Sequence, residues 1–149
     1  MDNITIDGVI VTPLKIIKHE LGDILHGMKS SDNGFKGYGE AYFSKIKYGE
    51  IKGWNKHNSL VMNLIVPIGK VGFVIYDDRK SSQTIGKYFA LDLSNKNYKR
   101  LTVPQNLWVA FCGIGKDENI ILNIANEEHD RNEVEKKGLE DIYFDWSCF

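Results

Sequence analysis

The sequence predicts an all-β fold, a sandwich or barrel of about ten short strands. Runs of β-branched and aromatic residues of strand length recur along the chain, and turn-forming residues separate them without any internal repeat. With 149 residues, the chain is long enough to bury one hydrophobic core. We therefore expect a single domain over residues 1–149.

The first clear strand is GEAYFSKI, residues 39–46, which alternates between two faces. Ala41 and Phe43 share one face, and Glu40, Tyr42 and Ser44 share the other. Further runs of strand length follow in order at 70–78 (KVGFVIYDD), 87–93 (KYFALDL), 107–114 (LWVAFCGI) and 119–125 (NIILNIA). The turns between them contain glycine, proline, asparagine or serine, as in SSDNG, PIGK, DDRKSSQ, SNKN and GKDEN.

One segment, residues 126–138 (NEEHDRNEVEKKG), breaks the strand pattern. It has an asparagine that can cap a helix, acidic residues in the first turn, lysines in the last turn and Gly138 at the end. We expect a short helix or a charged loop with helical turns near the C-terminus.

The composition excludes several classes of partner. The chain has 19 basic and 20 acidic residues, so it has no broad charge that would attract nucleic acid or an anionic membrane. Its longest apolar stretch, residues 60–69, is interrupted by Asn63 and Pro67 and is too short to span a bilayer. Cys112 and Cys148 form no CxxC pair, and the N-terminus lacks the order of a signal peptide. We expect a cytoplasmic protein without nucleic-acid or membrane partners.

The segment GEIKGWNKHNSLVMNLIVPIG, residues 49–69, has a distinctive spacing. Gly49 is followed by five residues and Asn55, then one residue and His57, four residues and Met62, and six residues and Gly69. On a strand, positions 55 and 57 point to the same face, and position 62 on the next strand returns to face them. A second segment, PQNLWV, ends at Val109.

This spacing resembles the two motifs of cupin barrels, Gly-x5-His-x-His-x(3,4)-Glu-x6-Gly and Pro-x-Gly-x-x-His. The resemblance implies a cupin-type double-stranded β-helix (jelly roll), here with a short C-terminal helical segment. Three of the four metal-ligand positions hold Asn55, Met62 and Val109, and the Gly position of the second motif is Asn106. These side chains cannot form the imidazole and carboxylate shell of Fe, Mn or Zn, so we expect no metal and no cofactor.

The chain most resembles the dTDP-4-dehydrorhamnose 3,5-epimerase-related proteins, over roughly residues 10–146. The resemblance is carried by GWNKH, PIGKVGFVIYDDR, VPQNLWVAF and the late HD…DW. In the true epimerases the first motif reads Arg-Gly-Leu-His, and that His removes the proton next to the 4-keto group. The matching residues here are Lys52 to Asn55, and a carboxamide has no useful basicity near pH 7. The family's active-site Lys corresponds to Met62, and its Tyr acid has no obvious match in NIILNIANEEHD.

The sugar 3,4-ketoisomerase branch of the same fold is a second resemblance. Its motif has two histidines one residue apart; His57 matches the second, and Asn55 falls on the first. We therefore expect His57 and Tyr42 to be catalytic, because an imidazole can accept a proton at neutral pH and a phenol can return it. We expect Lys52 and Asn55 to bind substrate.

Two further residues complete the expected substrate site, each with a structural alternative. Trp108 is expected as a pocket wall, because it lies in the second motif, although tryptophan is more often a core residue. Arg79 in YDDR is a diphosphate contact or, more simply, an ion-pair partner of Asp77 or Asp78 in a turn. We expect His26 and His129 to be structural.

The sequence thus predicts a homodimeric cupin that binds a nucleotide-activated keto-sugar. The reaction would be epimerisation or ketoisomerisation through an enolate, in surface polysaccharide biosynthesis. The alternative is a non-catalytic sugar-binding cupin that has lost its base. Position 55 separates the two, since a histidine there would favour an enzyme and Asn55 leaves both open.

Overall fold

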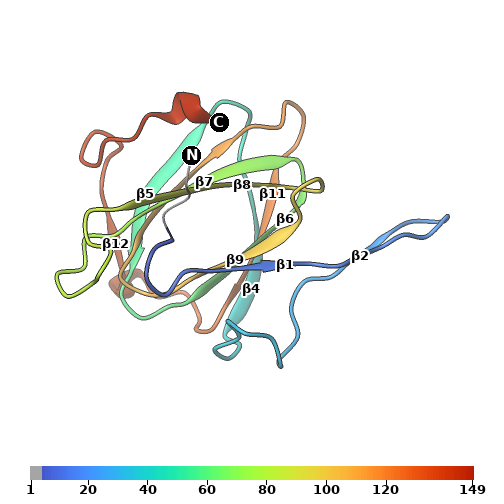
Figure 1. Ribbon diagram of the computed structural model, residues 1–149, viewed down its shortest axis with the longest axis horizontal. Helices are drawn as coiled ribbons and strands as arrows, with labels where there is room; N and C mark the ends of the chain where they lie inside the picture. Colours follow the sequence, from blue (N-terminus) through green and yellow to red (C-terminus); the bar gives the residue numbers. More distant parts are fainter. Residues whose placement is uncertain (1–4) are drawn as a thin grey trace.

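The computed structural model describes residues 5–149, which form two five-stranded antiparallel sheets packed face to face, with the segments that connect them (Figure 1). We name the sheets after the strands that carry the site. The β4 sheet has the order β1 (Ile10–Pro13), β9 (Lys99–Val103), β6 (Met62–Ile68), β11 (Ile120–Ala125) and β4 (Glu40–Lys45). The β5 sheet has the order β12 (Val134–Lys136), β5 (Ile51–His57), β10 (Trp108–Gly113), β7 (Lys70–Tyr76) and β8 (Tyr88–Ser94).

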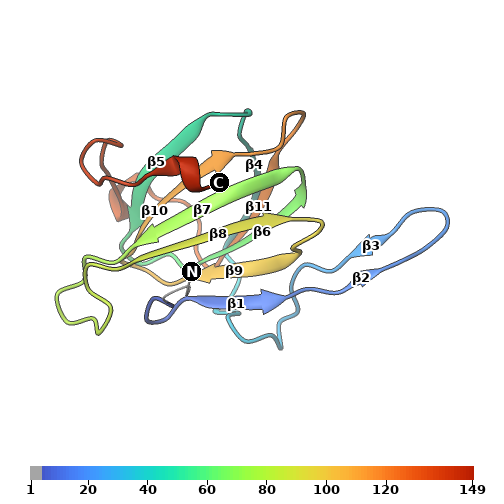
Figure 2. The same cartoon turned by 45° about the horizontal axis from the view of Figure 1, so that its top comes forward.

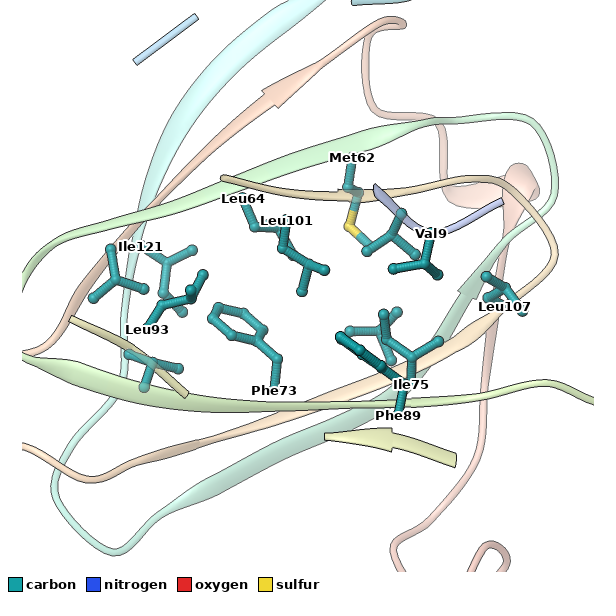
Figure 3. Packing of buried hydrophobic residues seen from close by; sticks show 14 of the residues in the cluster. Val9, Met62, Leu64, Phe73, Ile75, Phe89, Leu93, Leu101, Leu107 and Ile121 are labelled. Atoms are coloured by element: carbon teal, nitrogen blue, oxygen red, sulfur yellow. The ribbon is translucent and has the colours of Figure 1, made fainter. Parts of the chain in front are cut away.

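The main hydrophobic core lies between the two sheets (Figure 3). Leu64 and Leu101 of the β4 sheet point toward Phe73, Ile75 and Phe89 of the β5 sheet, and all five side chains are buried. Alternate residues along each strand reach this core because successive side chains point to opposite faces of a sheet. The predicted all-β jelly roll is confirmed, as are the five strand runs identified from the sequence.

A second apolar layer covers the outer face of the β5 sheet. Trp54 of β5 and Trp108 of β10 pack there against the C-terminal segment, residues 139–149, through Ile142, Phe144 and Trp146. Strands β5, β10 and β7 are therefore covered on both faces. Packing on the outer face holds these strands in place. The inner face of the same sheet lines the site described below.

The hairpin of β2 (Ile16–Ile17) and β3 (Ile24–Leu25) projects away from the two sheets (Figure 2). We call residues 15–26 the arm. Leu21 at its tip is 88% exposed, and Ile24 is 56% exposed. Large apolar side chains held out in solvent in this way are typical of surfaces that contact another molecule.

Residues 126–138 form a charged loop with one helical turn, the second of the two expected forms. A 3-10 turn, η1 (Arg131–Glu133), is capped by the Asp130 side chain, which accepts a hydrogen bond from Asn132 N. The chain then continues as β12, an edge strand beside β5 that the sequence did not predict. A second 3-10 turn, η2 (Trp146–Cys148), lies near the C-terminus. Within residues 5–149, no helix has the length and apolarity needed to cross a membrane.

Candidate functional site

A cavity of about 210 Å³ lies between the two sheets. Its polar lining consists of Tyr42, Ser44, Lys52, Asn55, His57 and Asn123, and its apolar lining of Met62, Leu64, Val109, Phe111 and Ile121. All four motif positions, 55, 57, 62 and 109, therefore converge on one cavity, as the spacing predicts. Four of the six predicted site residues, Tyr42, Lys52, Asn55 and His57, are brought together there.

A bulge in β5 explains how Lys52 and Asn55 reach the same cavity. Phe111 pairs with Lys52 and Val109 pairs with Asn55, so two residues of β5 lie opposite Ala110 alone. Gly53 occupies the bulge at φ 151°, and a Cβ there would lie 2.3 Å from Ala110 Cβ. Only glycine fits this position. The extra residue in β5 shifts the alternation of side chains by one position, so the Lys52 side chain faces the cavity.

The loop before β10 also holds the site in place. Asn106, at the glycine position of the second motif, has φ 69°, a left-handed conformation that asparagine tolerates better than most residues. Its backbone N–H donates to the carbonyl of His57 at 2.6 Å. The second motif therefore keeps its turn geometry, and this hydrogen bond holds the C-terminal end of β5 in place.

His57 is paired with Glu133, which comes from the 3-10 turn before β12. The Nδ1 to Oε1 distance is 2.5 Å, and both side chains are 11% exposed. The other carboxylate oxygen of Glu133 accepts hydrogen bonds from the backbone N–H groups of Ser59 and Leu60. The imidazole is thus held from one side by a fixed carboxylate.

The electrostatics of this pair define which ring nitrogen is available. Burial alone would raise the pKa of the Glu133 carboxyl, but the hydrogen bond and charge of His57 and the backbone N–H donors outweigh it and lower that pKa. An ionised Glu133 accepts the Nδ1 proton, so the lone pair of a neutral His57 lies on Nε2. This is the tautomer that a general base requires.

Tyr42 lines the cavity from the other sheet and is oriented by Asn123. The two residues are direct cross-strand partners on β4 and β11, and Asn123 Nδ2 donates to the Tyr42 hydroxyl at 3.0 Å. Asn123 Oδ1 accepts from the backbone N–H of Asn63, which fixes the orientation of the amide. Since the Tyr42 oxygen is already an acceptor, its own proton is available for donation.

The expected placement of Trp108 as a pocket wall is wrong. Its neighbour Val109 faces the cavity, so alternation turns Trp108 to the outer face of the β5 sheet, where it is 2% exposed. Its Nε1 donates to Asp78 at 2.8 Å, and the ammonium groups of Lys56 and Lys137 each lie 4.9 Å from its ring. Trp108 is a core residue that joins the C-terminal segment to β10.

Arg79 also lies outside the cavity lining. It pairs with Asp77, which is fully buried and also accepts hydrogen bonds from Ser82 and Thr84. The guanidinium and both hydroxyl donors outweigh burial and lower the pKa of Asp77. Of the two roles considered for Arg79, the structure places it in the turn-stabilising ion pair.

Glu133 and Asn123 are the functional candidates that sequence reasoning missed. Glu133 lies in the charged segment 126–138, where a short helix or a loop was expected, and Asn123 lies in the predicted strand run 119–125; neither was assigned to the site. Alternation along β11 points position 123 inward beside Ile121, a signal that could have identified Asn123. No local pattern marks Glu133, whose contact with His57 spans 76 positions.

The donor atoms of the cavity do not suit a metal ion. The cavity positions that correspond to metal ligands hold an amide, a thioether and an alkyl group beside His57. In the part of the chain that the structure describes, no three His, Cys, Asp or Glu side chains group together as a metal site. We predict no stoichiometric Fe, Zn, Mn or Ni in elemental analysis of the purified protein. One tightly bound metal per chain, lost in His57→Asn, would contradict this.

Comparisons with known proteins identify proteins similar to this chain. The family model described as dTDP-4-dehydrorhamnose 3,5-epimerase matches residues 5–146. A dTDP sugar isomerase from Desulfovibrio desulfuricans G20 has a similar structure, with TM-score 0.91 and 28% identity over 97% of this chain and 95% of that one.

Two further relatives are similar in sequence. The spore coat polysaccharide biosynthesis protein SpsL of Bacillus subtilis is 25% identical over 95% of this chain and 97% of its own length. A probable low-salt glycan biosynthesis epimerase of Haloferax volcanii is 23% identical over 66% of this chain and 64% of its own length, so that match spans less than two thirds of the relative. Together, the jelly roll, the converging motif positions and the match over residues 5–146 show that the chain belongs to the dTDP-4-dehydrorhamnose 3,5-epimerase family.

Proposed function

We propose that the protein is an epimerase or ketoisomerase acting on a nucleotide-linked 4-keto-6-deoxy sugar of the dTDP type. The observation that carries the proposal is the His57–Glu133 pair at the wall of the cavity. A carboxylate that holds Nδ1–H makes the imidazole a competent base at Nε2. The family match and the relatives in spore coat polysaccharide and glycan biosynthesis support a role in making surface polysaccharide.

The reaction begins at a carbon next to the keto group, where the C–H bond is acidified because its conjugate base is an enolate. His57 Nε2 removes this proton, and the Lys52 ammonium, also in the cavity lining, stabilises the negative charge on the enolate oxygen. Asn55 orients the sugar hydroxyls. No metal or cofactor is needed for these steps.

The return of the proton determines the product. Tyr42 belongs to the β4 sheet and His57 to the β5 sheet, so the two groups line the cavity from different sheets. Protonation of the same carbon by Tyr42 from the other face inverts that centre and gives an epimer. In ketoisomerisation, His57 instead returns the proton to the former carbonyl carbon, while the hydroxyl on the first carbon gives its proton to the enolate oxygen, so that the keto group moves to the first carbon. The non-catalytic alternative is disfavoured because sugar binding alone does not require an imidazole whose Nδ1 is held by a carboxylate.

The direct test of this function is solvent deuterium exchange into a panel of dTDP-4-keto-6-deoxy sugars, followed by mass spectrometry. Exchange at a carbon next to the keto group reports proton removal even without net turnover. We expect catalysed exchange with at least one sugar. Binding of the sugars without exchange would favour the non-catalytic alternative.

We also propose that the chain is a homodimer. The arm holds Ile17, Leu21 and Ile24 out in solvent. Phe43, which is 70% exposed, lies on β4, and one edge of β4 pairs with no other strand among residues 5–149. Pairing of two copies would cover such edges and apolar side chains. We predict twice the chain mass in sedimentation equilibrium at micromolar concentration, and a shift toward monomer in a Leu21→Lys, Ile24→Lys variant. A strict monomer in the parent protein would contradict the prediction.

A further inference from the structure

Lys56 lies between two cavity residues of β5 but points to the opposite face of the β5 sheet. Asn55 and His57 line the cavity, so alternation along the strand turns the Lys56 side chain to the outer face. That side chain is only 17% exposed, and a cation so largely removed from water needs partners. Lys56 is therefore held away from the reacting atoms, in a defined place on the far side of the sheet.

The partners of Lys56 come from three different elements. Its cross-strand neighbours are Trp108 of β10 and Glu135 of β12. Lys56 Nζ lies 4.9 Å from the centre of the Trp108 ring. It is also 3.6 Å from Glu135 Oε2 and 3.7 Å from Asp78 Oδ1, in the loop after β7. We call these four residues the outer cluster. A network of charges around one largely buried cation contributes more than an isolated surface ion pair.

Strand β12 depends on side-chain contacts of this kind. It has three residues and, within residues 5–149, pairs with β5 alone, at the edge of the β5 sheet. The backbone N–H groups of Trp54 and Lys137 each donate to the carbonyl of the other residue. The backbone N–H of Asn58 donates to the Glu133 carbonyl at 2.7 Å. An edge strand with so few backbone hydrogen bonds opens easily. The outer cluster therefore adds the contact that joins β12 to the centre of the sheet.

The position of β12 determines where the partner of His57 lies. Glu133 comes directly before Val134, the cross-strand partner of His57, and the Glu133 carboxylate holds His57 Nδ1. We propose that Lys56 is a positioning residue for the proton transfer. Its ion pair with Glu135 holds β12 against β5, and the docked β12 keeps the Glu133 carboxylate beside His57. This proposal rests on the proposed function and adds a residue that acts from the opposite face of the sheet.

Steady-state exchange kinetics test this role with Lys56→Met. We expect kcat for deuterium exchange into the sugar to fall about tenfold or more, since a displacement of about 1 Å at a catalytic group can cost about a hundredfold. KM should stay unchanged, because the cavity side chains that contact the sugar are intact. Lys56→Arg retains the cation and should keep kcat close to that of the parent. Unchanged kcat in Lys56→Met would contradict the proposal.

Two further variants complete the kinetic test. Lys70→Met removes a lysine–carboxylate pair of the same 3.6 Å separation, with Asp92, elsewhere on the β5 sheet, and should leave kcat and KM unchanged. Glu135→Gln removes the other partner of Lys56 at a position where the side chain is half exposed, so this variant is expected to fold. We expect Glu135→Gln to lower kcat as Lys56→Met does.

A double-mutant cycle with Glu133→Gln separates positioning from general stabilisation. If Lys56 acts through the Glu133 carboxylate, adding Lys56→Met to Glu133→Gln should lower kcat by much less than Lys56→Met does in the parent. Losses that multiply would overturn the proposal, because Lys56 would then act independently of Glu133.

Amide hydrogen exchange followed by NMR tests the docking of β12 without any catalytic activity. The backbone N–H groups of Trp54, Asn58 and Lys137 donate across this contact, so they should exchange several-fold faster in Lys56→Met. Faster amide exchange supports the proposed role of Lys56 even if the parent acts on no sugar, in which case only the proposed function fails. Unchanged exchange at all three amides in a folded Lys56→Met variant would overturn the proposal, even if the parent is an active enzyme.

Discussion

His57→Asn is expected to slow deuterium exchange and turnover by roughly a hundredfold to ten-thousandfold, the usual contribution of a general base. His57 is the histidine in the cavity lining whose Nδ1 is held by a carboxylate, which leaves Nε2 to accept the substrate proton. An asparagine side chain cannot accept that proton at neutral pH. The readout is the exchange rate with the best sugar of the panel.

The fold should survive this substitution, since the asparagine amide can still donate to Glu133. Thermal unfolding and the Kd for dTDP are therefore expected to stay close to those of the parent protein. The matched control is His26→Asn, the same substitution at a histidine that does not belong to the cavity lining. If His57→Asn exchanges protons as fast as the parent, the base lies elsewhere. His129, in the hollow that shares Tyr42, Asn55 and His57 with the cavity, is then the next residue to replace.

Trp108→Ala is expected to lower the free energy of unfolding by about 3–5 kcal/mol, the usual cost of removing a fully buried tryptophan. The loss combines a cavity under the C-terminal segment with the loss of the hydrogen bond from Nε1 to Asp78 and of the contacts with Lys56 and Lys137. Urea unfolding followed by fluorescence of the remaining tryptophans measures this change. Trp108→Phe retains most of the apolar volume and should be less destabilising.

Tyr143→Ala is the control for Trp108→Ala, because Tyr143 is in the same C-terminal segment but 80% exposed. We expect it to change the free energy of unfolding by about 0.5 kcal/mol or less. The Trp108→Phe variant should bind dTDP like the parent protein. A stable Trp108→Phe variant with strongly weakened dTDP binding would instead indicate a ligand contact, contrary to the position of Trp108 on the outer face.

The parts of the site that follow from strand alternation could be predicted from the sequence. Positions 55, 57 and 109 face the cavity because they lie on strands whose inward face the motif spacing defines. The same rule, applied one residue earlier, would have turned Trp108 outward. Trp108 was expected in the pocket wall because it belongs to the second motif. Its position in the alternation along the strand was not considered.

Strand alternation does not predict every contact in the site. The remaining contacts were either missed in the sequence or expected only because of the family resemblance. Simple alternation places Lys52 and Asn55 on opposite faces, and only the bulge at Gly53 brings them together. Glu133 reaches His57 because β12 adds to the edge of β5, a pairing between segments distant in sequence. Neither the charges nor the helical signals of residues 126–138 specify that pairing, since an edge strand of three residues has little sequence pattern of its own.

Deuterium exchange in His57→Ala, measured with and without added imidazole, tests most directly the claim that His57 is the base. Without imidazole, the rate should fall as it does in His57→Asn, because no side chain at position 57 can accept the substrate proton. Added imidazole should restore part of the exchange in His57→Ala, because the truncated side chain leaves space for the free base in the cavity. Exchange in His57→Ala as fast as in the parent without imidazole would contradict the account, because the base would then be a group other than His57.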